Sequence, residues 1–102
     1  MKKIIDGKVY NTETAALLGE WSNGYSNGDF NYVEENLYQT KKGQYFLQYG
    51  GGALTDYGVQ VGNSRGYGEG IQLLDKEEAK DWAESRLTAD EFITLFGEVE
   101  EG

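Results

Sequence analysis

The segment from Tyr49 to Gly70 is dense in glycine, and glycine-rich loops can cradle phosphate groups. A P-loop requires its glycines to run into Lys and Ser or Thr at the start of a helix, so that lysine and backbone N–H groups meet the phosphates. The segment contains no lysine, and its last three glycines lack the dinucleotide-binding spacing and precede a strand-like Ile-Gln-Leu-Leu. We expect hairpin loops here instead. They are either plain connections or a partner-contacting loop anchored by Arg65 and Tyr67, since Arg and Tyr often anchor interfaces.

The composition also disfavours catalysis. The chain has no His and no Cys, so the usual general base near neutral pH and the thiolate nucleophile are both missing. Its serines stand in no recognisable nucleophile motif. Its acidic residues form neither a calcium-loop pattern nor an obvious carboxylate pair for acid–base chemistry. We expect no enzyme activity, no metal and no cofactor.

Acidic residues gather toward the C-terminus. The formal net charge is −9, and residues 69–102 alone hold eleven acidic residues against three basic ones. Glu77, Asp81 and Glu84 recur at i, i+4 and i+7, which places them on one stripe of a helix with neighbouring Cβ atoms about 5–6 Å apart. Phosphates along a nucleic-acid strand have a similar spacing, so this stripe could occupy a basic channel built for nucleic acid. The alternative is an ordinary solvated helix face, with Lys80 partly neutralising Glu84.

An acidic surface attracts basic partners and repels nucleic acid and anionic membranes. We therefore expect no direct nucleic-acid binding and no membrane association, although the acidity could also serve solubility alone. No apolar run approaches the roughly 18 residues of a membrane span, and the N-terminal residues do not form a signal peptide. These features predict a soluble cytoplasmic protein, either a monomer or a homodimer. The candidate partner-binding residues are Glu77, Asp81, Glu84, Glu98, Glu100, Glu101, Arg65 and Tyr67.

Local signals predict the elements that would position these residues. Asp6-Gly7 predicts a tight hairpin turn, and a capped segment over Glu13–Trp21 predicts a short helix. A second hairpin is predicted for residues 30–49 with Gly43 in its loop, and alternating apolar residues predict further strands at residues 57–61 and 71–73. These patterns indicate five or six strands. We expect them to be antiparallel, because the connections are too short for crossovers.

The C-terminal third is predicted to be helical. Asp75 with Glu78, and Thr88 with Glu91, have the spacing of capping boxes, and Gly97 has the position of a helix stop. The fold class expected is α+β, a small antiparallel sheet with one short N-terminal helix and two C-terminal helices largely on one side. At this length the chain forms one domain. We assign it to residues 1–97 and expect residues 98–102 to be a flexible acidic tail.

Four stretches together resemble a known protein family. They are KKIIDGKVYNTETA, WSNGYSNGDF, LYQTKKGQYFLQYGGGALTDY and EEAKDWAESRLTADEFITLFGEVEE. They resemble small acidic proteins of plasmids, phages and conjugative elements of Firmicutes. These proteins include, or are related to, anti-CRISPR proteins that inhibit the RNA-guided DNA endonuclease of type II systems. The resemblance covers most of the chain and carries no catalytic motif.

The resemblance implies a function in the cytoplasm of a bacterial host cell. The expected partner is a type II CRISPR effector nuclease, which holds nucleic acid in basic channels. The protein would bind this effector stoichiometrically and compete with guide RNA or target DNA through nucleic-acid mimicry. The alternative is an accessory protein-binding module of a mobile genetic element that binds a different host or plasmid protein.

Overall fold

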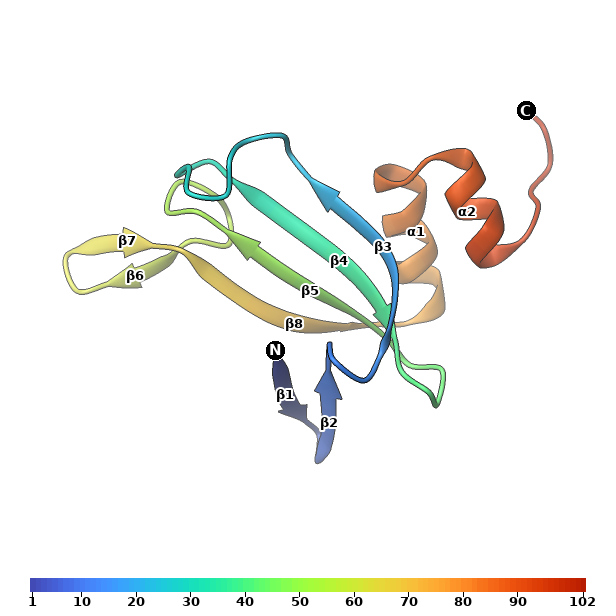
Figure 1. The fold of residues 1–102 in the computed structure, drawn as a ribbon, viewed down its shortest axis with the longest axis horizontal. Helices are drawn as coiled ribbons and strands as arrows, with labels where there is room; N and C mark the ends of the chain where they lie inside the picture. The colour runs from blue at the N-terminus through green and yellow to red at the C-terminus, as the bar shows by residue number, and fades with distance from the viewer.

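A computed structural model describes all 102 residues and shows a mixed fold of strands and helices (Figure 1). The elements are β1 (Lys2–Ile5), β2 (Lys8–Asn11), β3 (Ala16–Ser22), β4 (Val33–Gln39), β5 (Tyr45–Gly51), β6 (Val59–Val61), β7 (Ser64–Gly66), β8 (Gly68–Leu74), α1 (Lys76–Arg86) and α2 (Ala89–Phe96). The central sheet has the order β3-β4-β5-β8, and β1-β2 and β6-β7 form two separate hairpins. All strand pairs are antiparallel, as predicted.

The predicted N-terminal helix is wrong, because most of that segment forms the edge strand β3. The cap itself forms: the Asn11 side chain accepts a hydrogen bond from the Glu13 N–H at 2.9 Å, and the Asn11 carbonyl accepts one from the Ala15 N–H. The chain then leaves the turn and pairs with β4 through a bulge between Leu17 and Gly19. Ala and Leu favour a helix, and Gly19 lowers that preference. Pairing with the neighbouring strand β4 outweighs what remains of it.

The predicted count of five or six strands is also wrong, since the protein has eight strands in three sheets. β3 adds one strand, and β6 and β7 form a hairpin where the sequence predicts a single strand followed by a loop. The other turn predictions are confirmed. Asp6 and Gly7 both have positive φ in the first hairpin, as a two-residue turn of this type requires, and Gly43 has a φ of 92° in the β4–β5 turn.

Both C-terminal helices begin at the predicted capping boxes. Asp75 accepts a hydrogen bond from the Glu78 N–H at 2.8 Å, and Thr88 accepts one from the Glu91 N–H at 3.2 Å. Hydrogen bonds from Thr88 in turn hold the pKa of the Glu91 carboxyl below its usual range. α2 ends at Gly97, also as predicted, and residues 98–102 carry no helix or strand. No helix is long and apolar enough to cross a membrane.

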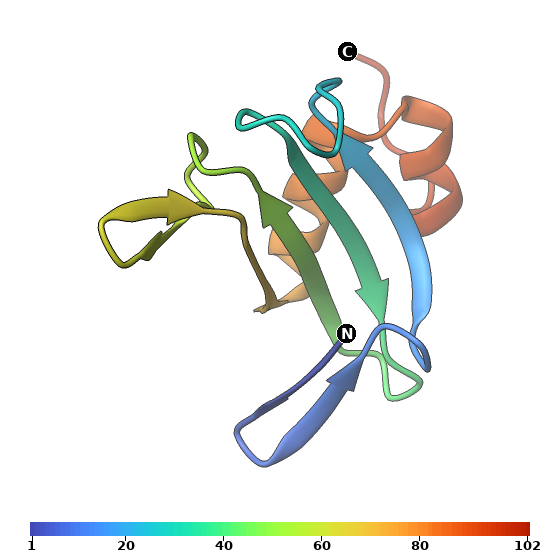
Figure 2. The same cartoon turned by 60° about the vertical axis from the view of Figure 1, so that its left-hand side comes forward.

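The helices cover one face of the central sheet, and the first hairpin covers part of the other (Figure 2). On the helical face, Ala79 of α1 is fully buried against Leu37 and Leu47 of the sheet. On the opposite face, Tyr10 of β2 packs edge-on against Phe46 of β5, with ring centroids 5.8 Å apart. The sheet therefore has a small apolar core on each side.

Several glycines of the glycine-rich segment lie where a tyrosine ring or the backbone of another segment comes too close for a side chain. A Cβ atom at Gly50 would overlap the Tyr67 hydroxyl, and one at Gly70 would overlap the Tyr49 hydroxyl. At Gly68 it would overlap the backbone carbonyl oxygen of Tyr57. These glycines are strand residues that permit close packing, which explains their density without any phosphate ligand.

Candidate partner-binding surface

α1 presents the predicted acidic residues to solvent. Ala79 and Ala83 of α1 have no exposed surface, and these small side chains let the helix approach the sheet closely. Glu77, Asp81 and Glu84 are all exposed. We refer to these three residues as the acidic stripe.

The acidic stripe has no basic partner. Arg86–Glu35 is the only ion pair in the protein, so the other acidic side chains have no basic nitrogen within 4.0 Å. Lys80 and Glu84 therefore form no ion pair. The like charges of Glu77 and Asp81 at i and i+4 repel each other by a few tenths of a kcal/mol, and no ion pair to the stripe offsets this repulsion.

The tail and the stripe lie on the same C-terminal part of the molecule. Glu98, Glu100 and Glu101 are exposed and follow α2 directly, and α2 packs beside α1 (Figure 1). The helical part of the protein therefore carries both the stripe and the tail acids.

Arg65 is a positioning residue of its own loop. Its Nε donates to the Ala53 carbonyl at 2.9 Å and its Nη2 donates to the Gly58 carbonyl at 2.8 Å. The guanidinium thus bridges the loop between β5 and β6. Since these bonds use donor groups that an interface anchor would need, the structure gives Arg65 a local structural role.

Tyr67 lies on the face of the sheet that the helices leave uncovered. It is 44% exposed, and its hydroxyl donates to Glu34 at 3.0 Å. Burial raises the pKa of Tyr67 above its usual range, and the hydrogen bond to Glu34 raises it further. The β6–β7 hairpin beside it projects from the opposite end of the sheet to α2 in both views (Figures 1 and 2). The structure therefore does not bring Arg65 and Tyr67 together with the acidic stripe.

Sequence reasoning missed the buried carboxylate Glu35, which links the sheet to α1. Glu35 is 6% exposed and accepts hydrogen bonds from the Tyr57 hydroxyl, from Trp82 Nε1 at 2.9 Å and from Arg86 Nε at 3.1 Å. The Arg86 guanidinium also stacks over the Trp21 ring, 3.8 Å from its centroid. The pattern of β4 does indicate that Glu35 is buried, because Glu35 lies between Val33 and Leu37 on the same face of the strand.

Burial raises the pKa of Tyr57, as does its hydrogen bond to Glu35. The hydroxyl therefore stays protonated and remains a donor to the carboxylate at neutral pH. No buried side-chain nitrogen or oxygen lacks a hydrogen-bond partner, so the Glu35 cluster is fully satisfied. Its chemistry is that of a structural clamp between β4 and α1.

Two further observations bear on the class of site. No group of three or more Asp or Glu side chains is arranged to hold a metal ion. Comparison of the chain with protein-family models, with curated proteins and with solved structures finds no significant match. The candidate site is therefore described by its geometry and charge alone.

Proposed function

We propose that this protein is a stoichiometric inhibitor of a type II CRISPR effector nuclease. It binds a basic nucleic-acid channel of the effector and competes there with guide RNA or target DNA. One observation supports this function most directly: the stripe Glu77, Asp81 and Glu84 is exposed and has no basic partner within the protein. The resemblance of four sequence stretches to small acidic proteins related to anti-CRISPR proteins identifies the class of partner.

The physical basis of the inhibition is competition for lysine and arginine side chains. Nucleic acid binds to a basic channel with a gain in free energy, because the lysine and arginine side chains release the counterions that surround the phosphates. The carboxylates of the acidic stripe stand on a rigid helix at intervals of about 5–6 Å, the Cβ spacing of i and i+4 neighbours. They can contact the same basic groups as the phosphates, but they offer the nuclease no bond to cleave. The clamp between Glu35 and Arg86 holds this helix against the sheet, so little ordering is required on binding.

The test is target-DNA cleavage by a purified type II effector, titrated with this protein before and after guide RNA is loaded. We expect inhibition to be complete near one protein per effector. Inhibition only before loading places the competition at the guide channel, and inhibition in both orders places it at the DNA-binding surface. Inhibition at amounts far below the effector would indicate an enzyme and contradict the proposal, as would no inhibition of any of several effector orthologues.

A matched pair of variants tests the acidic stripe. The triple variant Glu77→Gln, Asp81→Asn, Glu84→Gln removes three negative charges from the stripe. The triple variant Glu13→Gln, Asp56→Asn, Glu69→Gln removes three from exposed positions elsewhere. We expect the stripe variant to inhibit about tenfold less well and with a weaker salt dependence, and the control to stay within about twofold. Equal losses in the two variants would remove the stripe from the mechanism.

A further inference from the structure

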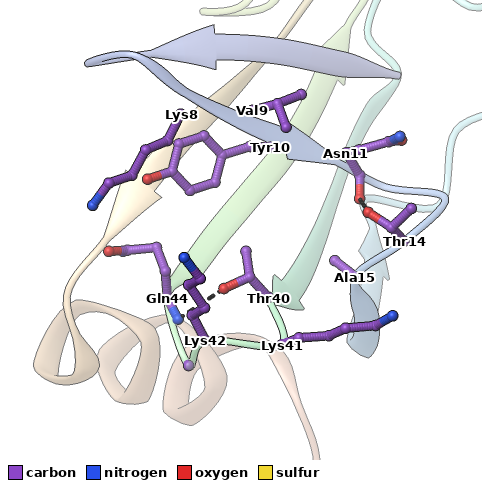
Figure 3. Close-up of a pocket in the computed structure, with 11 residues that line it drawn as sticks. Lys8, Val9, Tyr10, Asn11, Thr14, Ala15, Thr40, Lys41, Lys42 and Gln44 are labelled. Atoms are coloured by element: carbon purple, nitrogen blue, oxygen red, sulfur yellow. Dashed lines mark hydrogen bonds between the residues drawn. The ribbon is translucent and has the colours of Figure 1, made fainter.

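The most basic part of this acidic protein is a cleft at the end of the sheet away from the acidic tail. The cleft has a volume of about 730 Å³ and lies between the β1–β2 hairpin and the turn that joins β4 to β5 (Figure 3). Lys8, Lys41 and Lys42 line it, and no acidic residue does. We refer to it as the lysine cleft. Three lysines without an acid are unexpected in a chain with twice as many acidic as basic residues.

The positive charge in the lysine cleft is not offset within the protein. All three lysines are exposed, and none of them has a carboxylate within 4.0 Å, because the only ion pair is Arg86–Glu35. Lys3 extends the charge along the hairpin, since it pairs with Tyr10 and its side chain shares a hairpin face with Lys8. The hairpin and the turn therefore gather like charges that repel each other in the free protein.

The hydroxyl of the largely buried Tyr10 faces this charge without a protein partner. Tyr10 is 6% exposed and its ring is held against Phe46, yet its hydroxyl makes no hydrogen bond, although no fully buried polar atom in the protein lacks one. The hydroxyl therefore opens into the cleft, on the side where Lys8 lies (Figure 3). One more donor is free at the rim, the Thr40 hydroxyl, which accepts from the Gln44 N–H at 3.1 Å.

We propose that the lysine cleft binds a compact polyphosphate anion, such as pyrophosphate or the phosphate chain of a nucleoside triphosphate. The ammonium groups of Lys8 and Lys42 lie on the side of the cleft where the Tyr10 hydroxyl points, whereas Lys41 extends away from them (Figure 3). These donors match a ligand whose outer atoms are all hydrogen-bond acceptors. Lysine binds phosphate as a point charge, and the cleft has no arginine to form a bidentate fork with a carboxylate. The volume exceeds what a single orthophosphate needs and falls within the range of small-ligand sites.

The net charge of the protein favours a small ligand over a nucleic-acid strand. A compact anion experiences mainly the charges nearest to it, within a Debye length of about 8–10 Å, and the lining of the cleft carries lysines and no acidic residue. A long strand would also meet the acidic remainder of the surface. Tyr10 is buried against Phe46, so it offers no stacking platform for a base. This site is independent of the function proposed above, because it uses none of the acidic stripe.

The experiment is an NMR titration of the full-length protein with sodium pyrophosphate at constant low ionic strength. We expect saturable shifts of the Asn11, Gly43 and Gln44 amides that weaken as salt is added. Orthophosphate should bind more weakly, because it brings less charge to the same donors. Absence of saturable shifts at these amides would overturn the proposal. Tighter binding of a hexaglutamate peptide or of a short single-stranded oligonucleotide would also overturn it and assign the cleft to those ligands.

Variants separate the cleft from general charge. Lys8→Gln with Lys42→Gln should weaken pyrophosphate binding by more than about tenfold, since each nearby unit charge contributes about fivefold. Lys80→Gln removes one charge from α1, outside the lining of the cleft, and should change binding by less than about twofold, against about fivefold for Lys42→Gln alone. Tyr10→Phe keeps the packed ring and removes only the hydroxyl, so it should weaken binding without lowering the melting temperature. Equal losses in Lys42→Gln and Lys80→Gln, or full binding by Tyr10→Phe, would contradict the assignment.

Discussion

Two neighbouring glutamates on β4 show how one residue step changes the role of a charge. Glu34 faces the uncovered side of the sheet and accepts hydrogen bonds from the hydroxyls of Tyr32 and Tyr67. Glu35 faces the helices and is buried with Arg86 and Trp82. Because side chains alternate along a strand, the same residue type becomes a surface acceptor at one position and a clamp at the next.

Removal of the Glu35 carboxylate should destabilise the protein strongly. Glu35→Ala leaves the donors of Tyr57, Trp82 and Arg86 without their acceptor, and breaking a buried pair in this way typically lowers the free energy of unfolding by about 3 kcal/mol. Glu35→Gln keeps one acceptor oxygen and should lose about 1–2 kcal/mol. Urea denaturation measures both values.

The control for this prediction is Glu20→Ala on the neighbouring strand. Glu20 is exposed and makes no hydrogen bond or ion pair through its side chain, so its loss should stay within about 0.5 kcal/mol. A Glu35→Ala protein as stable as Glu20→Ala would show that the clamp contributes little, and the hold on α1 would then come from apolar packing alone.

At the scale of elements, the β5–β8 pair contains glycines that other segments approach too closely for a side chain to fit. Gly68→Ala places a Cβ atom against the backbone carbonyl oxygen of Tyr57, and Gly68 itself is held in the strand pair opposite Gly51. We expect the free energy of unfolding to fall by about 2–4 kcal/mol. Thermal unfolding followed by circular dichroism measures the loss.

Gly66→Ala is the matched control, two residues earlier in the chain. The added Cβ atom would meet only a flexible Val61 methyl group at 3.3 Å, so a change below about 1 kcal/mol is expected. If both glycine variants were equally stable, the close approach at Gly68 would not be a constraint on the fold.

The sequence predicted those elements whose signals are local. Asp75 with Glu78 and Thr88 with Glu91 satisfy helix ends within four residues, so the capping boxes could be identified without the fold. β3 could not be predicted in this way, since its state is decided by pairing with β4 rather than by its own residues.

The same distinction holds for the candidate site. The exposure of Glu77, Asp81 and Glu84 follows from helical periodicity, and the structure places all three in solvent. The role of Arg65 depends on carbonyl groups of Ala53 and Gly58 that only the folded loop brings within reach. The clamp at Glu35 likewise joins residues up to 51 positions apart, a separation at which the chain alone gives no distance.

At the scale of the whole molecule, basic and acidic residues are concentrated in different segments of the chain. Five of the nine basic residues lie in the β1–β2 hairpin and the β4–β5 turn, and eleven of the eighteen acidic residues lie in residues 69–102. With one ion pair in the entire protein, little of this charge is neutralised internally. Each group of residues therefore experiences repulsion among its own charges.

This division predicts how stability responds to salt. Screening weakens repulsion between like charges and would weaken ion pairs, but this protein has only one pair to lose. We expect the free energy of unfolding to rise by a few tenths to about 1 kcal/mol between low and near-physiological ionic strength. Urea denaturation at several sodium chloride concentrations measures this change.

The acidic stripe supplies the internal control for the salt effect. The variant Glu77→Gln, Asp81→Asn, Glu84→Gln removes repulsion along α1, so it should be more stable than the parent at low salt and gain less from added salt. A parent protein that loses stability as salt rises would mean that attractive contacts between charges outweigh the repulsion. The uncompensated stripe, on which the inhibitory function rests, would then be stabilised by longer-range attraction from the basic residues. In that case binding to a basic channel would have to overcome an attraction within the protein, and the affinity expected of the stripe would fall accordingly.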